Sequence, residues 1–426
     1  MSQVVKESKH FWGFAASHFS YFFIWAITYG FLTLWLGQQA GLSGAQSGVV
    51  FSLMAGMSLL FQPLFGVISD KLVFKKTLLI TIAIAGIFIG PYFQWVFMPI
   101  LAISPVLASI VTGIVLAFIL NGGVSVIEQY VQRASLANKF EFGHSRMGGS
   151  VAGAVSALVA GRLFLWQPNA IWWACSASAV LLTMLLLLFS TKINFSNAAA
   201  AMGASNEKLT KKDIFSIFKL RNFWILALFY MGASALFDVF DQQFIVFFKT
   251  FFETDSQGTI MYSYMNSAQT VIELCLMIPM PYIINKIGAR NGLLIYGFLT
   301  FVRIFGSAMA PSWEWIVFFR LLAGFEMPLL LVSIMKYISG AFDIRLYATV
   351  YALASNFAKQ ISVFIFSTVA GSMYDKVGYQ STYLMMSAVV MVITLVAVFF
   401  LEREKKVNPV EEAAGGPVEQ VTESQA

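Results

Sequence analysis

Long apolar stretches recur along this chain of 426 residues, and short polar segments separate them. A helix crosses the apolar core of a bilayer with about 20 residues, and we identify about twelve stretches of this kind. They lie near residues 11–36, 46–68, 77–98, 106–130, 145–165, 170–190, 222–248, 260–285, 291–309, 314–338, 347–372 and 379–401. The pattern predicts an all-α membrane protein with twelve transmembrane helices.

A longer polar segment divides these stretches into two groups of six. We expect an N-terminal half at 1–190, a cytoplasmic connector at 191–221 and a C-terminal half at 222–401. Residues 402–426 are rich in Glu, Pro and Gly, which predicts a disordered tail. Two parallel repeats of six helices around a cavity are a known plan for transporters, with the substrate site between the halves.

Composition supports a membrane protein and excludes several other classes. Hydrophobic residues make up 58% of the chain and charged residues 11%, whereas soluble domains have about 25% charged residues. Cys175 and Cys275 are the two cysteines, and both lie in apolar stretches, so neither a disulfide framework nor a CxxC metal site is expected. There is no Gly-Lys-Ser/Thr phosphate loop and no nucleophile beside a base. We therefore expect no enzyme, no metal and no cofactor.

Basic residues of the short loops gather on one side of the predicted membrane. The other side holds only Arg162, Lys249 and Lys376. Because lysine and arginine are enriched in cytoplasmic loops, both termini are predicted to be cytoplasmic. The net charge of +6 is attributed to this orientation and not to nucleic-acid binding.

Two aspartates, Asp238 and Asp241, lie inside the seventh stretch, three residues apart and so on one face of a helix. A carboxylate at the bilayer centre costs about 2.5–3.5 kcal/mol unless it faces protein or water and has a partner. The C-terminal half offers three bases in its spans, namely Arg303, Arg320 and Lys359.

We expect Asp241 to pair with Arg320 and Asp238 to pair with Lys359. This leaves Arg303 near Glu326, and Glu273 available to a substrate. Pairs of this kind can act directly or can simply hold helices together. Glu326 has no strong partner within its own apolar helix, a setting that favours a protonated carboxyl and is typical of a proton carrier.

In the N-terminal half, Glu128 and Arg146 face each other across one cytoplasmic turn. They can simply pair. They can also hold several sugar hydroxyls, because the carboxylate accepts hydrogen bonds and the guanidinium donates them. The residues alone leave both interpretations open.

At these positions the chain resembles the oligosaccharide:proton symporters of the major facilitator superfamily, which include the lactose, raffinose and sucrose permeases. The resemblance covers nearly the whole chain. It is strongest in Leu60-Phe-Gln-Pro-Leu-Phe-Gly66, Phe140-Glu-Phe-Gly143, Phe237-Asp-Val-Phe-Asp-Gln-Gln-Phe244 and Lys336-Tyr337-Ile. The loop that contains Gly66, Asp70 and Lys71 is similar to the superfamily's conformational-switch signature, although Val73 replaces its second glycine.

The resemblance implies a role for each charged position. Glu128 and Arg146 would be the main sugar-binding pair. Glu326 would carry the proton, with Arg303 as its positive neighbour. The two pairs on Asp238 and Asp241 would join helices, with Arg320 where lysine is usual.

Three positions depart from the family pattern. Gly153 stands where the lactose-type carriers have a stacking tryptophan. Thr270 and Glu273 stand where they have glutamate and asparagine, a pattern similar to the sucrose permease. Ala323 replaces a histidine three residues before Glu326. We hypothesise that Glu273 takes over part of that histidine's role.

We therefore expect a monomeric carrier of a bacterial cytoplasmic membrane that imports a disaccharide or trisaccharide together with a proton. The sugar would bind between Glu128 and Arg146 on one side and Glu273, with Asp241 or Gln242, on the other. The missing histidine motivates one rival, an uncoupled or sodium-coupled sugar carrier. A multidrug exporter and a sugar-sensing receptor are two others.

Overall fold

The structure is a computed structural model that describes residues 11–71, 76–138, 142–188, 216–343 and 346–404, and all regular structure in these ranges is helical. The side chains of Asp70 and Lys71 lie outside the described part, as do most of the predicted connector and most of the predicted tail. The proposed switch loop is therefore described only as far as the helix that carries Gly66.

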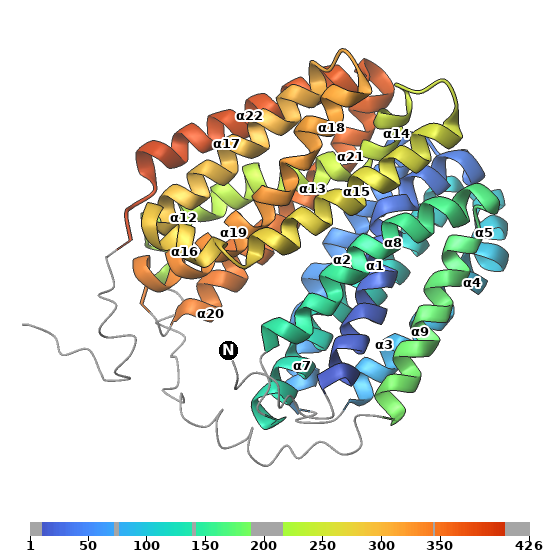
Figure 1. The fold of residues 1–426 in the computed structure, drawn as a ribbon, viewed down its shortest axis with the longest axis horizontal. Helices are drawn as coiled ribbons and strands as arrows, with labels where there is room; N and C mark the ends of the chain where they lie inside the picture. Colours follow the sequence, from blue (N-terminus) through green and yellow to red (C-terminus); the bar gives the residue numbers. More distant parts are fainter. Residues whose placement is uncertain (1–10, 72–75, 139–141, 189–215, 344–345, 405–426) are drawn as a thin grey trace, which may run out of the picture.

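Six spans form the N-terminal half, shown in blue to green in Figure 1. Two of them are broken into several helical segments. The spans are α1 (Phe11–Ala40); α2 (Gly44–Lys71); α3 (Thr77–Ile87), α4 (Ile89–Pro91), η1 (Tyr92–Val96) and α5 (Phe97–Ile103); α6 (Pro105–Leu116), η2 (Ala117–Gly122) and α7 (Gly123–Asn138); α8 (Phe142–Trp166); and α9 (Ala170–Leu188).

Six further spans form the C-terminal half, shown in yellow-green to red. Four of them are broken. The spans are α12 (Arg221–Phe229), η5 (Tyr230–Ser234), α13 (Ala235–Gln242) and α14 (Phe244–Lys249); α15 (Asp255–Met277) and α16 (Met280–Ile287); α17 (Ala289–Ala308); α18 (Trp313–Leu321) and α19 (Ala323–Ala341); α20 (Tyr347–Val350), η7 (Tyr351–Phe357) and α21 (Ala358–Val377); and α22 (Tyr379–Phe400).

The prediction of twelve spans is confirmed, although not all of them are equally apolar. Ten helices in the described residues are long and apolar enough to cross a membrane, and α15 with α16, bent by 63°, form an eleventh candidate. The span of α20 and α21 carries Lys359 and Gln360 near its middle. A charged residue at this depth indicates that the span faces protein or water there.

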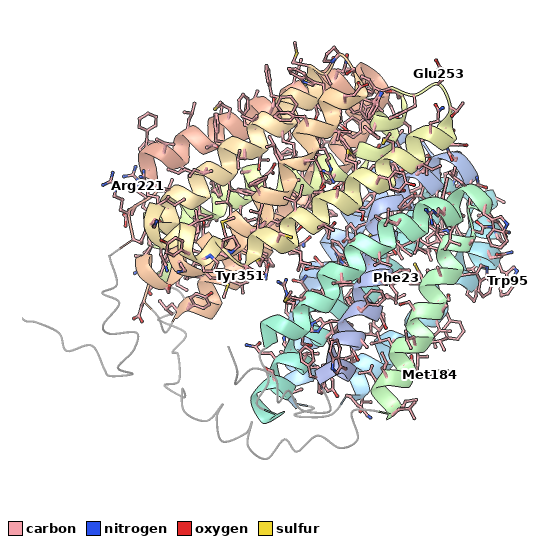
Figure 2. The ribbon with its side chains drawn as sticks, in the orientation of Figure 1. Phe23, Trp95, Met184, Arg221, Glu253 and Tyr351 are labelled. Atoms are coloured by element: carbon pink, nitrogen blue, oxygen red, sulfur yellow. The ribbon has the colours of Figure 1, made fainter. Side chains whose placement is uncertain are left out.

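The outer surface of the bundle is apolar. Ile103 and Phe399 are each 76% exposed, and Trp95 and Met184 project outward from the N-terminal half (Figure 2). Extensive exposed apolar surface marks contact with another apolar phase. Lipid chains would cover this surface in a bilayer.

In the part of the chain that the structure describes, four segments have π-helical geometry, and three of them adjoin the polar interior. The segment η2 contains Asn121, η5 directly precedes the helix with Asp238, and η7 directly precedes Lys359. A π-helical segment inserts one extra residue per turn and is frequent at functional sites. The extra residue changes the direction in which the following side chains point. Here Asn121, Asp238 and Lys359 line the cavity between the halves.

The two halves touch through α2 against α21 and α8 against α15. Hydrogen bonds between the halves run from the end of the bundle near Ala40 and Gly44 inward to Thr33 of α1 and Ser52 of α2. At the end near Gly44, the Asp375 carboxylate accepts hydrogen bonds from the backbone N–H groups of Gly44 (2.9 Å) and Ala45 (2.8 Å). At the opposite end α7 and α20 lie apart (Figure 1). The halves are therefore closed at one end of the bundle and separated at the other.

Candidate functional site

A cavity of about 490 Å³ lies between the two halves. Side chains of both halves line it, and eight of the ten residues predicted to bind sugar, carry the proton or pair between helices are among them. These eight are Glu128, Arg146, Asp238, Asp241, Gln242, Glu273, Arg320 and Lys359. Arg303 and Glu326 do not line the cavity, because both are fully buried behind its wall.

Glu128 on α7 and Arg146 on α8 form an ion pair on one side of the cavity. Arg146 Nε donates to Glu128 Oε1 at 3.0 Å. The side chain of Arg146 is 41% exposed and that of Glu128 is 33% exposed. This contact occupies one guanidinium N–H and one carboxylate oxygen. The remaining donors and the second oxygen can bind a polyhydroxyl ligand, so pairing and ligand binding are compatible here.

Small residues on α8 let α1 come close to this pair. A Cβ on Gly149 would lie 2.9 Å from the ring of Phe22, so a larger residue there would push α1 away. Phe22, Trp25 and Tyr29 of α1 line the cavity as a result. The rings of Trp25 and Tyr29 stack with centroids 4.3 Å apart, and Tyr29 donates to Asn121 Oδ1 at 2.7 Å.

Gly153, farther along α8, lies against the C-terminal half. A Cβ at this position would be 3.1 Å from Thr270 Cγ2 on α15. A larger side chain at position 153 would require Thr270 to move or would extend into the cavity, which Gly153 lines. The aromatic residues of the cavity wall come from α1 and from Phe51, Phe237 and Tyr262 of other helices, and none comes from α8.

On the opposite side of the cavity, Asp238 of α13 meets Lys359 of α21. Lys359 Nζ lies 2.8 Å from Asp238 Oδ2, and the side chains are 18% and 32% exposed, respectively. Asp241, one helical turn later, accepts from Arg320 of α18. Each pair joins two different spans of the C-terminal half.

Asp241 also binds a second guanidinium. Arg303 of α17 donates through Nη1 to Asp241 Oδ1 at 2.9 Å and through Nε to Glu326 Oε1 at 2.8 Å. Its guanidinium carbon lies over the rings of Phe237 (4.4 Å) and Phe240 (4.8 Å). Arg303 thus connects a cavity-lining carboxylate to a fully buried one.

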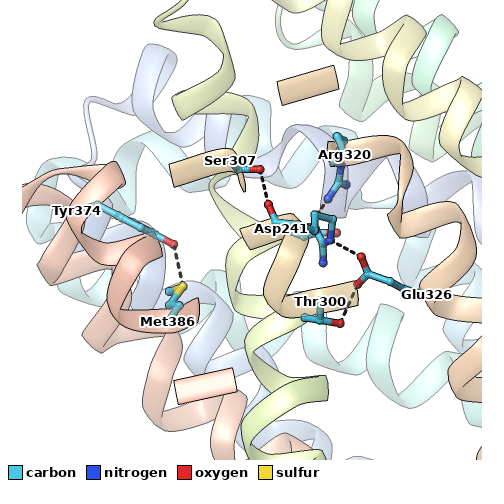
Figure 3. A network of polar contacts seen from close by, with 8 residues as sticks. Asp241, Thr300, Ser307, Arg320, Glu326, Tyr374 and Met386 are labelled. Atoms are coloured by element: carbon cyan, nitrogen blue, oxygen red, sulfur yellow. Dashed lines mark hydrogen bonds and ion pairs between the residues drawn. The ribbon is translucent and has the colours of Figure 1, made fainter. Parts of the chain in front are cut away.

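Thr300 completes the surroundings of Glu326, as Figure 3 shows. Its hydroxyl lies 2.9 Å from Glu326 Oε2 and 3.0 Å from the backbone oxygen of Tyr296, one turn back on α17. A hydroxyl has one proton and two acceptor sites. Thr300 can therefore donate to an ionised Glu326, or accept from a protonated one while donating to Tyr296.

Glu273 of α15 lines the cavity across from the N-terminal half. Arg146 of the N-terminal half lines the same cavity. In the described residues no hydrogen bond or ion pair occupies the Glu273 side chain. Its acceptor oxygens are therefore available to a ligand in the cavity.

Analysis of the sequence did not identify Thr300, Trp25 or Tyr29. Threonine is common in apolar spans, and two aromatic residues carry little information in a chain with 42 Phe and 10 Trp. Asn266 and Gln269 were detectable in principle, because their spacing places them on the same face of α15 as Glu273, which the sequence analysis did identify.

The chain as a whole is similar to known transport proteins. The family model described as LacY proton/sugar symporter matches residues 3–413. The raffinose permease of Escherichia coli is 38% identical over 93% of this chain and 93% of its own. The melibiose permease of Enterobacter cloacae is 38% identical over 94% of this chain and 95% of its own. The sucrose permease of Escherichia coli is 30% identical over 93% and 95%, respectively.

Solved structures show the same fold at lower sequence identity. A mutant of the nucleoside transporter NupG superposes with a TM-score of 0.78 at 16% identity, covering 92% of this chain and 100% of that one. The D-xylose-proton symporter gives a TM-score of 0.65 at 16% identity, covering 92% and 97%. At this identity the likeness concerns the arrangement of the helices alone.

Proposed function

This chain belongs to the LacY proton/sugar symporter family and has the twelve-helix major facilitator fold, and from this premise we propose how its own residues couple a sugar to a proton. It is a multi-pass membrane transporter, and it imports an oligosaccharide with a proton. The assignment of each residue below is our proposal.

The sugar binds in the cavity between the halves. Glu128 and Arg146 hold its hydroxyls from the N-terminal half, and Trp25 packs against the apolar face of a ring. Glu273, with Asp241 and Gln242, contacts it from the C-terminal half. The support for this placement is that all six residues line one cavity. A ligand held by both halves favours the change of access that carries it across.

Glu326 carries the proton. The observation that carries this proposal is the buried Arg303 guanidinium, which bonds both Glu326 and the cavity-lining Asp241. An arginine bridging two carboxylates redistributes its hydrogen bonds when one of them gains a proton. Protonation of Glu326 therefore alters the Asp241 surroundings, and through them the sugar site.

The conformation fits the state after proton release. The hydrogen bond between Arg303 and Glu326 is strongest with an ionised carboxylate, and the halves are closed at the end near Gly44. With both termini cytoplasmic, as the loop charges predict, the open end faces the cytoplasm. Sugar and proton would leave toward the same side, as import requires.

The remaining charges have structural roles in this proposal. The pairs of Asp238 with Lys359 and of Asp241 with Arg320 hold the spans of the C-terminal half together. The loop around Asp70 and Lys71 acts as a conformational switch between the halves. The protein works as a monomer in the bilayer of a bacterial cytoplasmic membrane.

The test is the external pH of a weakly buffered, de-energised suspension of cells that contain the protein. Sucrose, lactose, melibiose and raffinose are added in turn. Alkalinisation with one of them identifies the sugar and shows proton symport together. Sugar entry without a pH change would contradict proton coupling and indicate an uncoupled carrier or another ion. No entry of any of the four would contradict the sugar assignment.

A further inference from the structure

Three aromatic residues share one face of α1. Tyr21, Trp25 and Tyr29 follow one another at intervals of four residues, a spacing that places them on the same side of the helix. Trp25 and Tyr29 line the cavity, whereas Tyr21 is buried. Among the described residues that line the cavity, Trp25 is the only tryptophan. The contacts of this face therefore decide where that indole ring lies.

Both tyrosines of this face are hydrogen-bonded to the π-helical segment η2. Tyr21 donates to the backbone oxygens of Ile119 and Leu120. Tyr29 donates to the side-chain oxygen Oδ1 of Asn121 at 2.7 Å. One bond lies before Trp25 along α1 and the other lies after it, so the two tyrosines fix this stretch of the helix against η2.

Asn121 is itself held by a third span. Its Nδ2 donates to the backbone oxygen of Met54 on α2 at 3.0 Å, and the residue is only 8% exposed. An amide donates through its nitrogen and accepts through its oxygen. Because the nitrogen is bonded to Met54, the oxygen is the atom that faces Tyr29, and the tyrosine hydroxyl is the donor.

The Tyr29 ring in turn supports the Trp25 ring. The two rings stack with centroids 4.3 Å apart and planes inclined by 28°, and stacked aromatic rings attract each other beyond the area that they bury. A hydrogen bond at the tip of the Tyr29 side chain opposes a change of its rotamer. One face of Trp25 therefore keeps a fixed neighbour while the sugar site is empty.

We propose that Asn121 is a positioning residue for sugar binding, which holds the Trp25 ring in place through the Tyr29 hydroxyl. The inference rests on the proposed contact between Trp25 and the sugar and deepens it. A side chain that is already ordered loses less freedom when the ligand binds, which improves affinity. Tyr29 and Asn121 then contribute to affinity through Trp25, and not through hydrogen bonds of their own to the sugar.

The test is a double-mutant cycle of Tyr29→Phe and Trp25→Leu. Binding of sucrose, lactose, melibiose and raffinose to the purified protein is measured first, and the sugar that binds most tightly is used throughout. Tyr29→Phe keeps the ring and removes the hydroxyl, so we expect about three- to tenfold weaker binding. When Trp25 is already leucine, the same substitution should change the affinity by less than about twofold.

Tyr92→Phe is the matched control. Tyr92 is buried in the N-terminal half, its hydroxyl lies 2.8 Å from that of Thr112, and it does not line the cavity. Its substitution also removes one hydrogen bond, so it should lower the thermal midpoint as much as Tyr29→Phe does and leave the sugar affinity unchanged. Asn121→Ala removes the Tyr29 bond from the other side and should weaken sugar binding only where Trp25 is present.

An equal loss of affinity from Tyr29→Phe with and without the Trp25 ring would overturn the positioning role, because it would mean that the hydroxyl contacts the sugar itself. Unchanged binding by the single variant Tyr29→Phe would overturn it as well. Both results would leave the proposed function standing. Unaltered affinity of Trp25→Leu would overturn the ring contact together with the positioning role. A protein that binds none of the four sugars would overturn the proposed function and this inference together.

Discussion

The guanidinium Nε of Arg303 lies 2.8 Å from the carboxylate Oε1 of Glu326, and neither side chain has exposed surface. A buried ion pair is costly to break, because removal of one partner leaves an unpaired charge away from water. The same guanidinium bonds Asp241 at 2.9 Å. Arg303 therefore has a second carboxylate to bind when Glu326 is neutral, which makes the pair suitable for cycling between two protonation states.

The Thr300 hydroxyl is predicted to stay hydrogen-bonded to Glu326 while Glu326 gains and loses its proton. In Thr300→Val the carboxylate oxygen Oε2 loses its hydroxyl donor, a loss of about 1.5–3 kcal/mol for a bond to a charged group. We expect proton-driven sugar accumulation to fall about tenfold or more while sugar binding is kept. Thr300→Ser retains the hydroxyl and should retain accumulation. Equal accumulation by the valine and serine variants would contradict the role of the hydroxyl.

Trp25 is predicted to supply the apolar contact to the sugar ring. Trp25→Leu removes part of the ring surface from the cavity wall, and we expect sugar to bind roughly 5–30-fold more weakly, equivalent to about 1–2 kcal/mol. Equilibrium binding to the purified protein measures this. Trp12 is on the same helix but 76% exposed, so Trp12→Leu should bind sugar normally. Unaltered sugar affinity of Trp25→Leu would contradict a contact between the Trp25 ring and the sugar.

The pair of Asp238 and Lys359 is predicted to be structural. Lys359→Met leaves Asp238 without its partner, and we expect roughly 1–3 kcal/mol lower stability with impaired transport. This is less than the 3–5 kcal/mol of a fully buried pair, because the Asp238 side chain is 32% exposed. The double variant Asp238→Asn/Lys359→Met removes both charges and should recover stability and transport. A double variant as impaired as the single one would indicate a direct function for Lys359.

Asp375 is predicted to hold the closed end of the bundle. Its carboxylate caps the N-terminus of α2 from the other half, an interaction of about 1–2 kcal/mol. Asp375→Ala should shift the population toward a state open at this end by roughly 5–30-fold. The distribution of distances between spin labels at the exposed positions 39 and 377 should gain a population at longer distance. Glu253→Ala, at an exposed loop residue of the same end (Figure 2), should not produce it.

The sequence predicts the helices more completely than it predicts the site. Twelve apolar stretches give the spans directly, because bilayer thickness sets their length. The charged residues within them point to the polar interior, since a charge at this depth is rare without a function or a partner. Asp238 and Lys359, like Arg303 and Glu326, could be matched by counting acids against bases.

Other parts of the site depend on geometry that local sequence does not specify. The π-helical segments that aim Asp238 and Lys359 have no clear sequence signal. The bond from Arg303 to Asp241 depends on the packing of α17 against its neighbours. Thr300 matters because its hydroxyl contacts Glu326 across two different spans, α17 and α19.

The central claim is that Glu326 carries the proton and Arg303 links it to the sugar site. The most direct measurement compares Glu326→Gln with the unmodified protein in energised and de-energised vesicles. We predict that the variant exchanges labelled for unlabelled sugar across the membrane at a rate within a few-fold of normal. Because a glutamine cannot release a proton, it should not accumulate sugar against a gradient. Normal accumulation by Glu326→Gln would contradict the account.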